Sequence, residues 1–137
     1  MRVLTKLLIG IYLGSSLGQT ACSAQSDKEI VALVILGEAR GEGKAGMYAI
    51  ACVIKQRMIE KNRTARRVCL REDQFVTPNP KHFNSTSTAY ALKLADAICS
   101  GKDLDRKFVG YANHFCTLTT FPYWAKDRKP VKVIKNH

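Results

Sequence analysis

A capped and almost wholly apolar segment opens the patterned part of the chain. Ser26-Asp27-Lys28-Glu29 has the spacing of a capping box, and seven apolar residues, 30–36, follow it at once. The β-branched residues in this run would also suit a strand, but the cap and the continuation through Glu38-Ala39-Arg40 favour a helix. Because apolar residues surround the axis on every side, we predict a central, buried helix rather than an amphipathic one.

Three more helical segments are expected after the glycines at 41, 43 and 46 break the pattern: residues 45–61, 64–70 and 89–100. The first carries Met47, Ile50, Ile54 and Met58 on one stripe, and Gly101 ends the last. Residues 71–88 are rich in Pro, Asn, Ser and Thr and predict a long loop, which we expect to form one wall of a cleft. The pattern indicates a mainly α, small single-domain fold with a loop-rich C-terminal part.

The length and composition agree with one folded domain. A chain of 137 residues has room for a single core, and 46% hydrophobic with 24% charged residues is a globular composition.

Residues 1–24 differ from the rest and have the pattern of a secretory signal peptide. Arg2 and Lys6 precede an apolar run that is too short to span a bilayer comfortably, and small residues offer a cleavage point after Ala24. We therefore expect an exported protein, periplasmic or extracellular, whose functional domain is residues 25–137. Two alternatives stay open: lipidation of Cys22, or retention of the segment as a membrane tether.

Cleavage there would leave four cysteines, Cys52, Cys69, Cys99 and Cys116. An even number in an oxidising compartment suits two disulfides, although the pairing cannot be read from the sequence. The cysteines and histidines lack the spacing of a zinc site, so we expect no metal and no cofactor.

The charge predicts a polyanionic partner. The net charge is +11, and removal of residues 1–24 takes away two cations and leaves +9. For an exported protein we expect peptidoglycan and the anionic cell envelope surface as partners rather than nucleic acid.

Glu38 is the candidate for acid catalysis. On a helix it extends the stripe of Val31 and Val34 at the C-terminal edge of the most apolar element. Partial desolvation there would raise its pKa, as a general acid requires, and the helix macrodipole would act in the same direction. The alternative is that Glu38 merely pairs with Arg40 or another cation.

Glu42 follows four residues later, but the surrounding glycines separate it from the helix, so it is expected beside the catalytic acid rather than at the reacting bond.

Several motifs in one order resemble the SleB-like cell wall hydrolase family. Residues 37–42, Gly-Glu-Ala-Arg-Gly-Glu, and then residues 49–57 are similar to the E-A-R-G-E element and the following V-I-L-N-R-like helix of that family. The later matches are Gln74-Phe75 for Q-F, residues 110–115 for G-A-x-x-F, Pro122 to Ala125 for P-x-W, and His137 for the start of H-x-F. The resemblance covers residues 29–137, with the departure that Gln56 stands where the family usually has Asn.

This resemblance implies a small lysozyme-like helical fold and identifies Glu38 with the family's catalytic glutamate. It implies cleavage between N-acetylmuramic acid and N-acetylglucosamine, as a lytic transglycosylase that needs one acid. The residues expected to line a sugar-binding groove are Phe75, Tyr111, His114, Phe115, Tyr123 and Trp124. Gln74, like Glu42, is expected to support the acid.

We expect the protein to act as a monomer. Three alternatives to the transglycosylase interpretation stay open: a hydrolytic muramidase, a catalytically silent cationic binder of the cell wall, and a basic nucleic-acid-binding protein.

Overall fold

All regular structure in the described residues is helical. The computed structural model describes residues 24–76, 78–84, 86–120 and 122–135, and these contain no strand. The elements in chain order are α1 (Asp27–Ala39), the 3₁₀ segment η1 (Arg40–Glu42), α2 (Gly43–Lys61), α3 (Ala65–Cys69), η2 (Pro80–Asn84), α4 (Thr88–Cys99), η3 (Arg106–Val109) and η4 (Tyr123–Ala125). The prediction of a small, mainly α single domain is confirmed.

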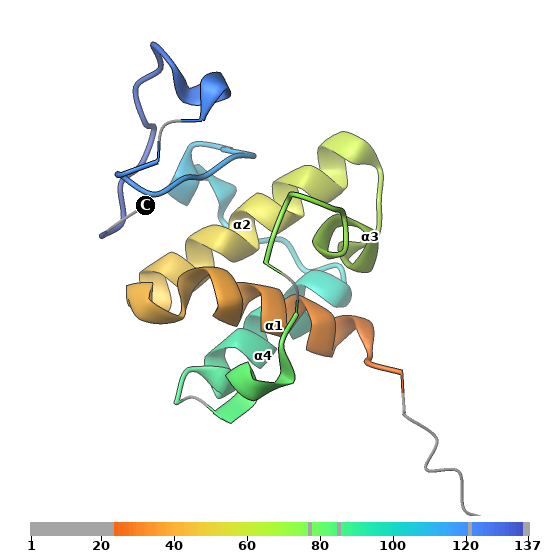
Figure 1. The fold of residues 1–137 in the computed structure, drawn as a ribbon. Helices are drawn as coiled ribbons and strands as arrows, with labels where there is room; N and C mark the ends of the chain where they lie inside the picture. The colour runs from red at the N-terminus through yellow and green to blue at the C-terminus, as the bar shows by residue number, and fades with distance from the viewer. Residues whose placement is uncertain (1–23, 77, 85, 121, 136–137) are drawn as a thin grey trace, which may run out of the picture.

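Helix α1 is the central element, as its sequence predicts. The Ser26 hydroxyl accepts from the Glu29 N–H at 3.2 Å, and the Glu29 carboxylate accepts from the Ser26 N–H at 2.8 Å, which is the reciprocal pair of a capping box. Every residue from Ile30 to Leu36 is buried, and α1 packs against α2, α3 and α4 (Figure 1). Each aliphatic side chain buried in this way contributes about 1.5–3 kcal/mol of transfer free energy. The core is therefore built around α1.

Helix α2 begins two residues earlier than its pattern predicts. The break after α1 is short, since η1 and a positive φ of 71° at Gly43 complete the turn and Gly46 already lies within α2. Met47, Ile50 and Ile54 of the predicted stripe are buried, and Met58 packs partly against the same core. Asn62 ends the helix in the left-handed conformation.

The predicted helix at residues 89–100 is α4, which buries Ala91, Leu94, Ala95 and Ile98. Gly101 follows it with φ 80°, a conformation that glycine adopts without strain. The preceding loop is less irregular than expected, because it contains η2, a segment that the Pro-rich composition did not predict. No helix in the part of the chain that the structure describes is both long and apolar enough to cross a membrane.

The C-terminal segment, residues 110–135, returns to the junction of α1 and α2 (Figure 1). Its end is tied there by Lys135, whose Nζ donates to the Gly41 carbonyl oxygen at 3.1 Å. Further back, Val131 packs on the open face of Gly110. Lys132 lies over the ring of Phe108 at 4.7 Å. The predicted signal peptide, Cys22 and His137 lie outside the described residues.

Candidate functional site

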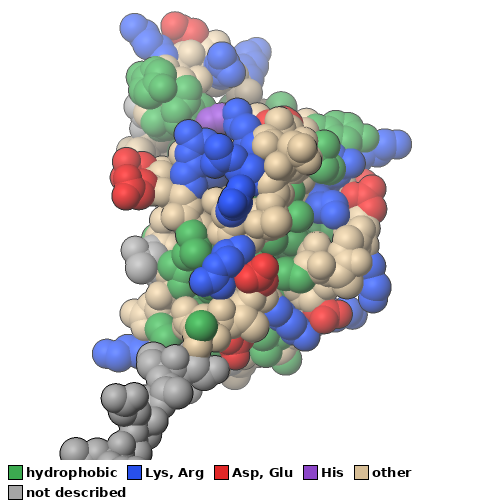
Figure 2. Space-filling model, turned by 90° about the vertical axis from the view of Figure 1, so that its right-hand side faces the viewer, with side chains coloured by type: hydrophobic (Ala, Val, Ile, Leu, Met, Phe, Trp, Pro, Cys, Tyr) green, Lys and Arg blue, Asp and Glu red, His purple; other side chains and the backbone are tan. Residues whose placement is uncertain are grey.

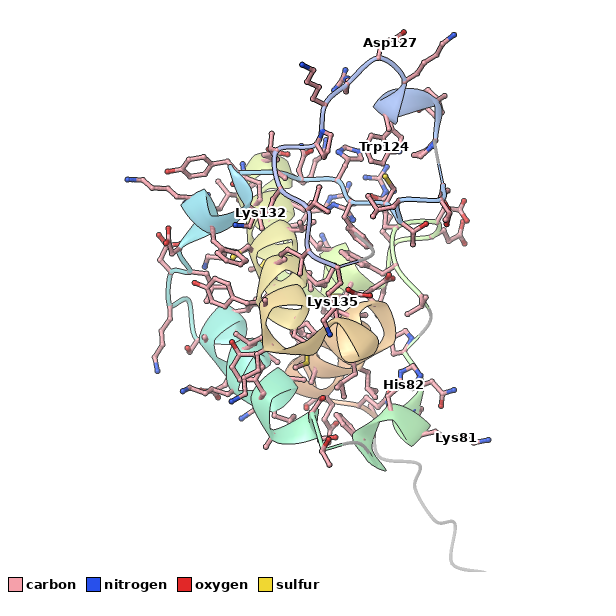
Figure 3. All side chains as sticks on the ribbon, turned by 90° about the vertical axis from the view of Figure 1, so that its left-hand side faces the viewer. Lys81, His82, Trp124, Asp127, Lys132 and Lys135 are labelled. Carbon is pink, nitrogen blue, oxygen red and sulfur yellow. The ribbon has the colours of Figure 1, made fainter. Side chains whose placement is uncertain are left out.

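A hollow of about 340 Å³ separates the first half of α2 from the C-terminal segment. Its volume lies in the range of small-molecule sites. We call it the apolar hollow, and its lining comes from residues 39–53, 109–118 and 124–134. Figure 3 shows the C-terminal segment running beside α2, from Trp124 at its far end to Lys135 near the α1–α2 turn.

Glu42 is the acid that lines this hollow. Its side chain is only 9% exposed, the lowest of the described charged residues. It packs directly over Gly46, where an added Cβ would collide with the Glu42 Cβ. Because residue 46 is a glycine and has no side chain, the Glu42 side chain can lie against the first turn of α2.

Glu38 is half-buried at the end of α1 and is held by the loop after α3. The backbone N–H of Val76 donates to Glu38 Oε1 at 2.6 Å. The loop approaches this closely because Gly37 has no side chain: a Cβ there would collide with Val76 Cγ2. Glu38 is not part of the lining of the apolar hollow.

Arg57 connects Glu38 to the hollow. Its guanidinium interacts electrostatically with Glu38 and lies 4.7 Å from the centre of the Phe75 ring, while its Nε donates to the Asn113 carbonyl oxygen at 2.6 Å. Phe75 stacks on Phe115 with ring centres 6.0 Å apart, and Phe115 lines the apolar hollow. Burial lowers the pKa of Arg57, and the charge of Glu38 opposes that shift.

A chain of polar contacts fixes the position of His114. Gln56 donates to one oxygen of Glu60 at 2.9 Å, and the Asn113 amide donates to the other at 2.7 Å. Since the Asn113 nitrogen is used in this way, its Oδ1 accepts from His114 Nδ1 at 2.6 Å. In neutral His114 the proton is then on Nδ1, and Nε2 is an acceptor.

The same contacts shift two pKa values. The hydrogen bond from Asn113 is the main cause that lowers the pKa of Glu60, with a smaller contribution from Gln56. Burial is the main cause that lowers the pKa of His114, and the charge of Arg57 adds to it. The result is an ionised Glu60 beside a histidine that favours its neutral form.

In the comparison with protein families, the cell wall hydrolase family matches residues 41–137. This range is well over half of the chain. The chain belongs to the cell wall hydrolase family. Membership makes it a hydrolase that acts on peptidoglycan. Comparison with curated proteins and with solved structures gave no match.

The matched range includes Glu42, the Arg57 cluster and the C-terminal segment, but it begins three residues after Glu38. The family match therefore supports the substrate class and leaves the choice of catalytic acid to chemical argument. Gln56, where the resemblance leads us to expect asparagine, lies within the matched range. Its side-chain oxygen accepts from Arg106 at 2.8 Å while its nitrogen donates to Glu60, so it joins η3 to the His114 contacts.

The aromatic residues expected at the sugar site divide into two groups. Trp124 and Phe115 line the apolar hollow, and the Trp124 ring lies 4.8 Å from His114. Phe75 lies behind Phe115. Tyr123 is 92% exposed and Tyr111 packs against Arg106 at 5.6 Å, and neither lines the hollow.

The four cysteines within the described residues are free thiols in the structure, and the two disulfides expected from their number stay a prediction. Cys69 is part of the hydrophobic core, and Cys52 is buried with its Sγ 3.7 Å from the Asp105 carbonyl oxygen. Burial raises the pKa of Cys52 to about 11 and that of Cys69 to about 12. Cys116 lines the apolar hollow and Cys99 is exposed.

The described residues contain no group of three or more side chains that could hold a metal ion. Gln74, expected beside the acid, lines a second hollow near the end of α2, together with Asn113 and His114.

The sequence alone did not identify Arg57, Glu60 and Asn113 as candidate site residues. Arg57 and Asn113 lie inside the matched motifs, but only the fold brings these two residues, 56 positions apart, into contact.

Proposed function

We propose that the protein cleaves the glycan strand of peptidoglycan between N-acetylmuramic acid and N-acetylglucosamine as a lytic transglycosylase, with Glu38 as its single acid and base. Family membership supports the polymer, and the contacts of Glu38 support the residue. The observation that carries the assignment is that this half-buried carboxylate accepts a hydrogen bond from the Val76 N–H and interacts electrostatically with the Arg57 guanidinium.

These two neighbours favour the carboxylate form of Glu38, which opposes the effect of burial expected from the sequence, and they suit the step in which Glu38 loses its proton. A backbone N–H and a guanidinium that are already oriented stabilise the negative charge as it develops on the carboxylate. Neither group has to reorganise at that moment, because Gly37 holds the loop close and Asn113 holds Arg57. The stabilisation therefore increases along the step in which Glu38 acts as an acid.

The reaction has two proton transfers. Glu38 protonates the glycosidic oxygen as the bond from the muramoyl C1 breaks, and the bonding electron pair goes to that oxygen. The C6 hydroxyl oxygen of the same sugar then forms a bond to C1, and the Glu38 carboxylate takes the hydroxyl proton. The product carries a 1,6-anhydro ring, and neither water nor a second carboxylate is consumed.

The apolar hollow is the proposed place for a neighbouring sugar of the bound strand, because Glu38 does not line it and the bond that is cleaved must lie beside Glu38. Trp124, Phe115 and the ring of His114 offer flat faces to the apolar faces of pyranose rings, and neutral His114 offers Nε2 as an acceptor for a hydroxyl group. Glu42 is proposed to orient the sugar from the opposite wall rather than to react.

Muropeptide analysis tests the proposal. Purified peptidoglycan is digested with residues 25–137 of the chain, and the products are separated and weighed by mass spectrometry. We expect anhydro ends from the unmodified domain and none from Glu38→Gln. Glutamine keeps an oxygen that can accept from Val76 but cannot supply the proton. Glu72→Gln, the same change at an exposed acid in the same loop, serves as the matched control and should leave the products unchanged.

Each other outcome selects a different function. Reducing ends in place of anhydro ends would make the protein a hydrolytic muramidase. Binding without any product, in both the unmodified domain and the Glu72→Gln control, would make it a silent cell wall binder. Full activity of Glu38→Gln with loss of activity in Glu42→Gln would move the catalytic role to Glu42.

We also propose export to the periplasm or the extracellular space, on the basis of the signal-like residues 1–24. The mass of the intact secreted protein tests this directly. A mass that starts at Gln25 fits cleavage after Ala24, and an added lipid mass would indicate anchoring through Cys22.

A further inference from the structure

A second hollow, of about 220 Å³, lies where the end of α2, helix α3 and the following loop meet. We call it the basic hollow, because five cations and one acid line it. The cations are Arg57, Lys61, Arg63, Arg67 and Arg71, and the acid is Glu60. Figure 2 shows Lys and Arg side chains gathered on this face of the molecule.

The positive charge of the basic hollow is only partly neutralised by its surroundings. The ion pairs within the described residues involve Lys28, Arg66 and Arg106, none of which lines the basic hollow. Among the described residues that line the basic hollow, Glu60 is the one acid, and both of its oxygens already accept hydrogen bonds from amide groups. Outside the lining, the charge of Glu38 acts on Arg57 alone among these cations in the contacts described above. Like charges held together in this way leave a site that an external anion would stabilise.

Arg57 adds unused hydrogen-bonding capacity to this charge. Its Nη1 is buried and makes no hydrogen bond to any described residue, whereas its Nε is satisfied by Asn113. A buried donor without a partner destabilises the folded protein, and an acceptor on a ligand would satisfy it. The charge of Arg71 also contributes to lowering the pKa of Arg57, so an anion bound between them would relieve a mutual repulsion.

The basic hollow is continuous with the apolar hollow through two residues. Asn113 and His114 line both. A ligand that fills the apolar hollow can therefore extend past His114 into the cluster of arginines. A bound polymer with an uncharged backbone and an anionic branch would match the two hollows in order.

We propose that the basic hollow binds the carboxylate groups of the peptidoglycan stem peptide while the sugar chain occupies the apolar hollow. This proposal rests on the proposed function for the position of the sugar. The stem is attached to the muramic acid residue, so the same substrate delivers its carboxylates beside the site of cleavage. Guanidinium groups bind carboxylates through two parallel hydrogen bonds, which suits a hollow dominated by arginine.

Calorimetric titration of the folded domain with small fragments tests the proposal without any turnover. The three probes are a disaccharide tetrapeptide with free carboxylates, the same compound with every carboxylate amidated, and the disaccharide alone. We expect the free-acid compound to bind at least ~10-fold more tightly than the other two, which corresponds to about 1.4 kcal/mol. This preference should weaken as salt is added.

Two variants with equal loss of charge separate a specific site from general attraction. The test variant replaces three arginines of the basic hollow: Arg63→Gln, Arg67→Gln and Arg71→Gln. The control replaces three exposed lysines on η2, α4 and the turn after α4: Lys81→Gln, Lys93→Gln and Lys102→Gln. We expect the test variant to lose the preference for free carboxylates and the control to keep it.

Three results would overturn the proposal: equal binding of the three probes, an equal loss in both variants, or tighter binding of a phosphodiester polymer or DNA oligonucleotide than of the stem compound. Circular dichroism confirms that each variant is folded. The outcome is independent of the glycan-cleavage assay. Stem preference without cleavage would contradict only the proposed function, and cleavage without stem preference would contradict only this inference.

Discussion

Glu38 and Val76 are joined by a hydrogen bond of 2.6 Å from the Val76 N–H to Glu38 Oε1, which ties the end of α1 to the loop that follows α3. The two residues are 38 positions apart, and their approach depends on Gly37, which leaves space for the Val76 side chain. Gly37 has no side chain that could react, yet it thus sets the position of the proposed acid, Glu38.

Gly37→Ala is expected to lower activity far more than stability. The added Cβ collides with the end of an exposed valine side chain, which can rotate away, so the free energy of unfolding should change by less than about 1 kcal/mol. The displaced loop, however, weakens the hydrogen bond to Glu38. We expect the rate of release of soluble muropeptides to fall about tenfold, which corresponds to ~1.4 kcal/mol of transition-state stabilisation. Val76→Ala in the same background removes the colliding methyl group and should restore most of the rate.

Glycine at position 46 makes a second test of close packing. Alanine normally stabilises the interior of a helix by up to about 1 kcal/mol relative to glycine. Here the added Cβ would meet the Cβ of buried Glu42, and overpacking costs about 1–3 kcal/mol. We therefore expect Gly46→Ala to lower the melting temperature by several degrees. Gly41→Ala is the matched control, since nothing lies within 4 Å of its added Cβ, and an equal loss in that variant would contradict the argument.

The fold was predictable to the extent that local signals agree. The capping box and the run of apolar residues specify α1, and the stripe from Met47 to Met58 specifies the buried face of α2. The start of α2 was misplaced by two residues because its first turn contains Gly43 and Gly46, and the tolerance of Gly46 there depends on Glu42 packing over it. That is a tertiary effect with no local signal.

The sequence identifies a candidate catalytic residue only where that residue has a chemical role of its own, and the role of Glu38 stays a prediction. Glu38 stands out as an acid beside an apolar helix. In the sequence, Arg57 is one of many cations and has no distinguishing feature. Its importance comes from its contacts with Phe75 and Asn113, and only the fold brings these two residues close to Arg57. Tyr123 looks like a sugar-binding residue from its motif, yet the structure leaves 92% of it exposed.

The reactivity of the thiols follows from their burial. A thiol whose pKa is about 11, as at Cys52, is about one thousandth ionised at pH 8, and Cys69 less still. In reduced, folded protein we expect iodoacetamide to modify Cys99 and Cys116 first, as read by peptide mass mapping. Cys52 and Cys69 should react only after unfolding. Modification of Cys69 at the rate of Cys99 would contradict this order, and a linked pair of peptides in non-reduced secreted protein would show which cysteines form the expected disulfides.

The pKa of His114 predicts how the stability of the protein depends on pH. Burial and the charge of Arg57 lower this pKa below its ordinary value of 6.5, so the folded state binds fewer protons here than the unfolded state. The resulting stabilisation is fully present above pH 6.5 and is lost as the pH falls through the pKa of the folded state. NMR titration of the ring protons should give a midpoint below 6.5, and Arg57→Gln should raise it, whereas Lys93→Gln should not.

Glu60 adds a second, more acidic step with the same sign. The hydrogen bonds from Asn113 and Gln56 lower its pKa below 4.5, so its contribution is lost only as the pH falls through that lower value. Melting temperatures should therefore decrease on acidification in two stages, one just below pH 6.5 and one below pH 4.5. His114→Gln should remove the first stage and Glu60→Gln the second. A melting temperature that rises between pH 7.5 and 5.5 would contradict the sign of the His114 shift, and one that rises as the pH falls below 4.5 would contradict the sign of the Glu60 shift.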